Sequence, residues 1–232
     1  VLVEESLDEL ILLPREWIDR GLADVAPERV ERARVIRGDQ SVNVTVTGGR
    51  AYNMDGLADD EILDQAKASR MARAMRHLRA VTIADPSLDD RQLGLADPVI
   101  FQLALRNGLT YEARVGTESE GDTPGRYVRL SASYQEPPAP AREKAEARVP
   151  PAAGDEQTPR EQLVEEECQR LLLEHQEQAA ELATEAVEFN TRVRSWTYVI
   201  GTYYADSMTM TRDDLVKTEE HDEDDMPPEA LR

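Results

Sequence analysis

Val99-Ile100-Phe101-Gln102-Leu103-Ala104-Leu105 is a largely apolar run, and the dipeptide Asn107-Gly108 follows it after one intervening residue. Asn-Gly between two such runs is a strong signal for a β-hairpin, because both residues accept the positive φ of a tight turn. We therefore expect a return strand over Leu109–Gly116. A third strand is expected over Arg126–Tyr134, where apolar and polar residues alternate. The stretch predicts a three-stranded antiparallel meander.

The residues before the meander predict a second hairpin and a helix. Ser41–Thr47 alternates strictly between valine and polar residues, and Gly38-Asp39-Gln40 separates it from a looser alternation over Val30–Arg37. This arrangement indicates two paired strands around a turn. Asp59-Asp60 then opens an expected helix that runs to Leu78, because acidic residues at a helix N-terminus offset its dipole and cap its free amides.

A long helix is expected after the meander, from Thr158 to about Arg194. Thr158 is the expected N-cap, Pro159 suits the first helical position, and Glu161 completes a capping box. At 1.5 Å per residue, about 35 residues make a helix of ~50 Å. Its expected apolar stripe consists of Val164, Cys168, Leu171, Leu172, His175, Ala179, Leu182, Ala183, Ala186, Val187 and Val193.

These patterns predict an α+β fold in which antiparallel β hairpins and meanders pack with helices, one of them a long amphipathic C-terminal helix. Residues 137–158 are rich in proline, alanine and charge, a composition that buries too little apolar area to fold by itself. The expected segments are 1–85, a β-hairpin and helix unit; 86–136, the meander; 137–158, a linker or insertion that is disordered around a short helix near 142–148; 159–217, the long helix, an aromatic strand and a short helix that complete the fold; and 218–232, an acidic disordered tail.

The charge of the chain narrows the classes of partner. The net charge is −20, which repels the phosphate backbone of nucleic acids and disfavours anionic lipid surfaces. It favours solubility and suits basic partners. The single cysteine, Cys168, excludes an intramolecular disulfide and fits the apolar stripe of the long helix as a small core residue.

The motifs of common catalytic and cofactor sites are missing from the sequence. It contains no phosphate-binding loop, no dinucleotide fingerprint and no nucleophile elbow. The three histidines, His77, His175 and His221, are far apart, and one cysteine cannot build a thiolate zinc site. We therefore expect no catalytic, cofactor-binding or metal-binding residues and predict that the protein is not an enzyme.

The aromatic residues gather near the C-terminal end, at Trp196, Tyr198, Tyr203 and Tyr204. Such a group can form an interaction surface for a sugar or a peptide. A group of this kind more often forms the edge of a hydrophobic core. We take these four residues as the candidate interaction surface.

Several segments of the chain carry a family resemblance. They are Leu13–Arg20 with Val25–Val30, the helix end Leu78–Val81, Gly94–Pro98 leading into Asn107–Tyr111, Asn190–Ile200, Tyr203–Asp206 and Thr211–Leu215. In these segments the chain resembles the family called domain of unknown function 4340, and Trp196 lies in the most specific of them. The resemblance covers most of the chain outside the linker and the acidic tail.

The resemblance implies a bacterial envelope protein that is exposed outside the cytoplasm and similar to auxiliary subunits of gliding-motility-type ABC transporters. It implies a membrane tether through an N-terminal helix and no known catalytic residues. The sequence begins at Val1 without such a helix, so the anchor either precedes Val1 or is absent. The expected location is the periplasm or another extracytoplasmic space.

Three functional hypotheses follow from these observations. The first is an envelope accessory or scaffold protein, which binds protein partners, such as ABC transporter subunits, through the long helix and the aromatic segment. The second is a binding module for a glycan or a cell-wall peptide, with Trp196, Tyr198, Tyr203 and Tyr204 as its platform. The third is a hydrolytic or metal-dependent enzyme, for which the sequence offers no catalytic set.

Overall fold

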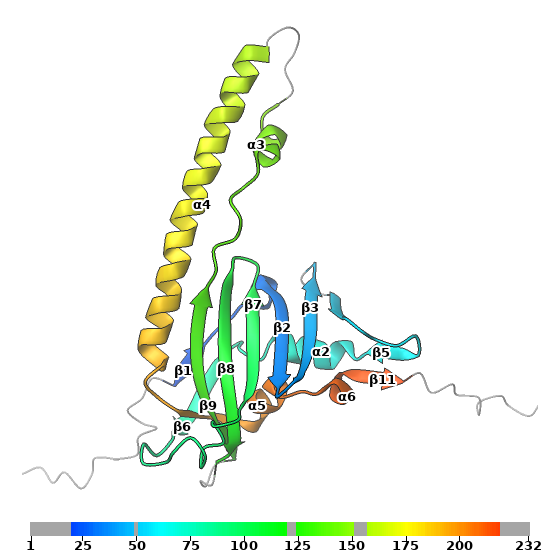
Figure 1. Cartoon of the computed structure of the whole chain (residues 1–232), viewed down its shortest axis with the longest axis vertical. Coiled ribbons are helices and arrows are strands. Elements are labelled where there is room, and N and C mark those ends of the chain that lie inside the picture. Colours follow the sequence, from blue (N-terminus) through cyan, green and yellow to red (C-terminus); the bar gives the residue numbers. More distant parts are fainter. Residues whose placement is uncertain (1–19, 49–50, 120–123, 151–156, 219–232) are drawn as a thin grey trace, which may run out of the picture.

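A computed structural model describes residues 20–48, 51–119, 124–150 and 157–218 (Figure 1). The first 19 residues, which include most of the first resemblance segment, lie outside the described residues. So does the predicted acidic tail, apart from Thr218.

The described residues form an α+β fold around one large antiparallel sheet, as the sequence predicts. The sheet has nine strands, and a separate pair, β11 (Val216–Thr218) and β5 (Glu61–Leu63), stands beside it. The nine strands, in spatial order, are β1 (Gly21–Ala23), β6 (Leu78–Ile83), β10 (Tyr198–Gly201), β9 (Gly125–Tyr134), β8 (Leu109–Glu118), β7 (Val99–Leu105), β2 (Val30–Arg37), β3 (Gln40–Thr47) and β4 (Ala51–Met54).

The predicted meander is confirmed as β7, β8 and β9 at the centre of this sheet. Its first turn depends on Gly108, whose φ of 88° is unfavourable for any side chain. A Cβ atom there would also lie 2.1 Å from the carbonyl oxygen of Gln135. The predicted second hairpin is confirmed as β2 and β3, with Arg37 opposite Gln40. Because β2 also pairs with β7, strands from both of the first two expected segments share one sheet.

One face of the sheet carries the main core and the other faces away from it. Phe101, Leu103, Leu109 and Val128 are buried on the inner face. Helices α2 (Gln65–Ala72) and α5 (Thr202–Met208) contact strands on this side, and the C-terminal end of the long helix also packs there. Smaller elements complete the fold: the 3₁₀ helix η2 (Pro27–Arg29) and the helix α6 (Arg212–Leu215).

The helix after β4 starts later than its acidic residues predict. Asp64, and not Asp59-Asp60, is the N-cap of α2, and its carboxylate accepts hydrogen bonds from the amides of Ala66 and Lys67 at 3.0 and 3.2 Å. Glu61–Leu63 cannot join the helix because this segment pairs with β11 as strand β5. Leu78, the predicted helix end, is the first residue of β6.

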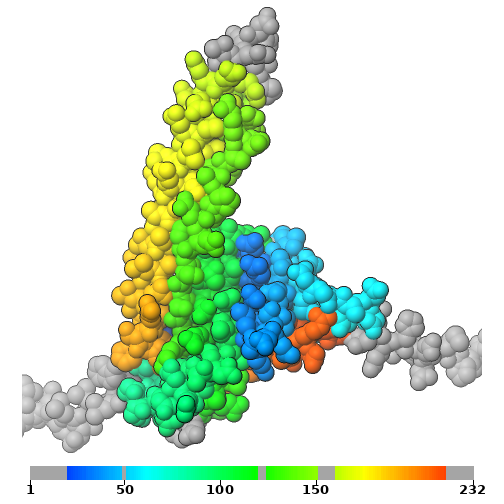
Figure 2. All heavy atoms as spheres, viewed as in Figure 1, coloured from blue at the N-terminus to red at the C-terminus, as the bar shows by residue number. Residues whose placement is uncertain are grey.

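The predicted long amphipathic helix is confirmed as α4 (Gln157–Val193), which has 37 residues and is therefore about 55 Å long. Its C-terminal half lies along β9, while its N-terminal half rises beyond the sheet (Figures 1 and 2). There α3 (Arg142–Arg148) packs against it. The short helix expected near 142–148 is confirmed as α3, and its one buried residue, Ala145, packs against Val164 and Leu171.

Candidate functional site

The side of α4 that faces the protein forms what we call the inner stripe. Its members are buried or half-buried and lie three or four residues apart, which keeps them on one side of the helix. The lower members pack beside β9 and the upper members beneath α3. The inner stripe consists of Val164, Cys168, Leu171, His175, Ala179, Leu182, Ala186, Phe189 and Val193.

Asn190 joins the lower end of α4 to the edge of the sheet. Its side-chain amide donates to the carbonyl oxygen of Ala132 at 2.7 Å and accepts from the backbone N–H of Ala132 at 2.8 Å. One side chain thus satisfies both backbone groups of an edge residue in β9, as a neighbouring strand would.

An aromatic contact holds the same part of α4 on the inner face. The rings of Phe189 and Tyr111 meet edge to face with centroids 5.0 Å apart. The Tyr111 hydroxyl donates to Glu185 on α4 at 2.9 Å. Burial and this carboxylate raise the pKa of Tyr111 well above its ordinary value, so the phenol stays protonated and remains a donor.

The upper half of α4 is held to α3 by charge as well as by packing. Glu167 on α4 accepts from Arg148 on α3 at 3.2 Å and from Arg170 at 2.7 Å. Burial pushes the pKa of Glu167 up, but the hydrogen bonds from the two arginines outweigh it and lower the pKa below its ordinary value. α3 and the upper half of α4 are therefore held together, and they project from the sheet (Figure 2). We call this pair of helices the arm.

A second stripe runs along α4 on the side that faces solvent, and we call it the outer stripe. Its members are four and three residues apart in alternation, the 3.5-residue spacing of helices that pair lengthwise. All of them are exposed, with Leu173 57% and Val187 64% accessible. The outer stripe consists of Gln169, Leu173, Gln176, Ala180, Ala183 and Val187.

The outer stripe is uncharged although α4 as a whole is rich in glutamate. At about 100° per residue, its members point away from the inner stripe. The exposed residues Glu166, Glu177 and Glu188 line one flank, while Leu172, itself 41% exposed, lies on the other. α4 therefore presents an uncharged seam of two large apolar residues, two alanines and two glutamines, with one acidic border.

The structure does not bring the four predicted aromatic residues together into one platform. The Tyr198 side chain is buried in the main core, and Trp196 is 50% exposed just beyond the end of α4. Tyr203 and Tyr204 on α5 meet edge to face at 5.6 Å, and the guanidinium of Arg70 lies 4.9 Å from the Tyr203 ring centroid. Neither tyrosine of this pair has a ring contact with Trp196.

The described part of the chain offers little to other classes of site. No three histidine, cysteine, aspartate or glutamate residues gather there as a metal site would require. None of its helices is long and apolar enough to cross a membrane. The expected buried stripe includes Leu172, Ala183 and Val187, but the structure shows all three to be exposed, so this part of the expectation is wrong. The sequence signal for the outer stripe is that Ala183 and Val187 belong to a second 3.5-residue repeat.

Comparisons with known proteins were negative: no family model, no characterised protein and no solved structure matches the chain. The resemblance to domain of unknown function 4340 stays a prediction.

Proposed function

We propose that the protein is a non-catalytic scaffold that binds a helix of a partner protein along the outer stripe of α4. The observation that carries the proposal is the contrast between two stripes with the same kind of spacing on one helix. Sheet and α3 cover the inner stripe, and no described element covers the outer one.

The spacing and size of the outer stripe fit a helix better than a strand or a loop. From Gln169 to Val187 the stripe is about 27 Å long, and only a helix laid along α4 keeps contact over several heptads. The small residues Ala180 and Ala183 let a second backbone approach closely. Full burial of Leu173 and of Val187 would each stabilise the complex by at most about 1.5 to 3 kcal/mol. A contribution of this size suits a reversible complex.

The charges beside the stripe point to the chemistry of the partner. Glu166, Glu177 and Glu188 would lie next to the flanking residues of a docked helix, where opposite charges set partner choice. A helix with lysine or arginine on its flank is therefore favoured. The net charge of −20 also speeds the approach of a basic partner and slows that of an acidic one.

The family resemblance supplies the setting in which we place this scaffold. We propose an extracytoplasmic location, tethered to the membrane through a segment before Val1, and a subunit of an ABC-type transporter as the partner. The projecting arm extends the binding surface beyond the sheet (Figure 1).

Two substitutions on the same helix test the proposed function. Ala180→Glu places a carboxylate in the outer stripe, whereas Gln178→Glu adds the same charge to an exposed position on the opposite side of α4. After crosslinking and affinity purification from native envelopes, we expect the wild-type protein and Gln178→Glu to retain the same basic-flanked partner and Ala180→Glu to lose it. Retention by Ala180→Glu, or equal loss with both variants, would contradict the proposal.

A further inference from the structure

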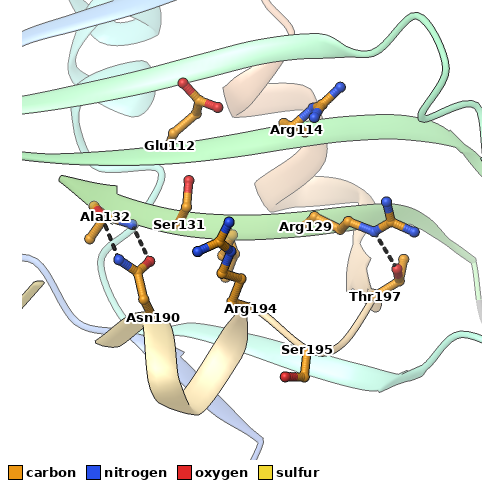
Figure 3. A pocket seen from close by; sticks show the side chains of 10 residues that line it. Glu112, Arg114, Arg129, Ser131, Ala132, Asn190, Arg194, Ser195 and Thr197 are labelled. Atoms are coloured by element: carbon orange, nitrogen blue, oxygen red, sulfur yellow. Dashed lines mark hydrogen bonds between the residues drawn. The ribbon is translucent and has the colours of Figure 1, made fainter. Parts of the chain in front are cut away.

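A second surface feature lies on the far side of the sheet from the main core. A hollow of about 500 Å³ opens between the outer face of β8 and β9 and the segment that leaves α4 (Figure 3). Three arginines line it: Arg114 from β8, Arg129 from β9 and Arg194 from just beyond α4. We call this site the arginine hollow.

The three arginines differ in whether their guanidinium groups have hydrogen-bond or ion-pair partners. Arg129 donates to the Thr197 hydroxyl at 2.9 Å and to the carboxylate of Asp90 at 2.7 and 3.2 Å, so it is a structural residue. The guanidinium groups of Arg114 and Arg194 are exposed and have no ion-pair or hydrogen-bond partner among the described residues. Both guanidinium groups are therefore available to an anionic ligand, although the chain as a whole carries a net charge of −20.

One carboxylate lies in the same hollow, and it has another partner. Glu112 accepts a hydrogen bond from Gln102 on β7 at 3.0 Å. Arg114 lies opposite Arg129 in the sheet, so their side chains share the outer face and repel one another. The hydroxyl of Ser131 adds a neutral donor, and Figure 3 shows the Arg194 side chain directed from α4 toward it.

The hollow also reaches a stretch of the β9 edge that has no neighbouring strand. β10 pairs with β9 from Gly125 to Val128, and Asn190 occupies the backbone groups of Ala132. Leu130 lies between these two places and lines the hollow. Because backbone groups of alternate residues point to the same edge of a strand, the N–H and C=O of Leu130 face this gap.

We propose that the arginine hollow binds an extended acidic peptide segment of another protein. One residue of the peptide pairs through its backbone with Leu130, and its acidic side chains or terminal carboxylate reach Arg114 and Arg194. Arginine suits this role, because its planar guanidinium donates two parallel hydrogen bonds to a carboxylate. The backbone pairing favours a peptide over a free inorganic anion. This site is separate from the outer stripe and takes a ligand of the opposite charge.

Peptide-binding measurements on the full chain test this assignment. The probe is a fluorescein-labelled hexaglutamate peptide, with a hexaglutamine peptide for comparison, followed by fluorescence anisotropy. The variant Arg114→Gln/Arg194→Gln removes both unpaired guanidinium groups, and the control Arg76→Gln/Arg79→Gln removes two exposed charges away from the hollow. Because the substituted arginines are exposed, circular dichroism should show the same spectrum and the same melting temperature for the wild-type protein and both variants.

We expect hexaglutamate to bind, hexaglutamine not to bind, and the hollow variant to bind about tenfold more weakly or worse, while the control keeps wild-type affinity. Ala180→Glu should leave peptide binding unchanged, which separates this test from that of the proposed function. The inference is overturned if hexaglutamate does not bind at millimolar concentration, or if both arginine variants lose affinity equally. Displacement of the peptide by inorganic phosphate at an equal concentration would also overturn it, since it would show a simple anion site.

Discussion

The inner and outer stripes of α4 run along the same helix with a similar three-and-four spacing, yet their surroundings are opposite. Phe189 and Val193 of the inner stripe are buried in the main core, whereas Leu173 and Val187 of the outer stripe remain exposed. Hydrophobic periodicity therefore shows that one side of a helix can pack against another element. Only the tertiary structure shows whether that element belongs to this chain.

Truncation of the two stripes should separate them most clearly. Phe189→Ala removes a buried ring that contacts Tyr111, and it should lower the free energy of unfolding by about 3 to 5 kcal/mol. Val187→Ala, two residues away, should change it by less than about 0.5 kcal/mol because the side chain is exposed. Chemical denaturation of the purified variants measures both values, and similar losses would show that the outer stripe is covered in the isolated protein.

The bond between α4 and the sheet edge should account for the next largest effect. Asn190→Ala leaves the backbone N–H and C=O of Ala132 without their partner, which should cost about 1 to 3 kcal/mol. Thr191→Ala is the matched control, since the Thr191 hydroxyl bonds only within α4, to the carbonyl oxygen of Val187. If denaturation shows the two variants to be equally stable, Asn190 does not act as a substitute for a strand.

Detaching α3 should have a smaller and local effect. Ala145→Asp puts a carboxylate where Ala145 is fully buried against Val164 and Leu171, a cluster separate from the main core. We expect α3 to leave α4 while the unfolding free energy of the sheet falls by less than about 1 kcal/mol. The alkylation rate of Cys168, which lies against this cluster, should rise. An unchanged alkylation rate would show that α3 does not shield α4.

Acid should loosen the same arm through Glu167. The pKa of Glu167 is below its ordinary value of 4.5 in the folded protein, so its bonds to Arg148 and Arg170 stabilise the arm above about pH 4.5 and are lost as the pH falls through the lowered pKa. The NMR signals of α3 should therefore shift toward those of an unfolded segment below this pH. A midpoint above pH 4.5 would assign the transition to another group.

Much of the fold follows from local sequence signals, and the remainder depends on partners distant in the chain. Asn107-Gly108 predicts the central meander, and the run from Thr158 predicts α4. The start of α2 at Asp64 was not predictable, because Glu61–Leu63 is held as a strand by Val216–Thr218. The burial of Ala145 likewise depends on α4.

The candidate sites show the same limit. The repeat that forms the outer stripe is present in the sequence, but the sequence does not say which of the two stripes the sheet and α3 cover. The arginine hollow joins Arg114, Arg129 and Arg194 only through the pairing of β8 with β9 and the return of the chain after α4. The aromatic residues suggested a platform in the sequence, whereas strand β10 places the Tyr198 side chain in the core.

The most direct test of the outer stripe is a photo-crosslinking scan of α4 in native envelopes, with one photoreactive residue at each position from Gln169 to Glu188. We expect adducts to one partner at the six positions of the outer stripe and none at Glu174, Gln178 or Glu181, so that the crosslinking yield rises and falls every three or four residues. Adducts without this period, or confined to the acidic side, would contradict the central claim that a partner helix binds along α4.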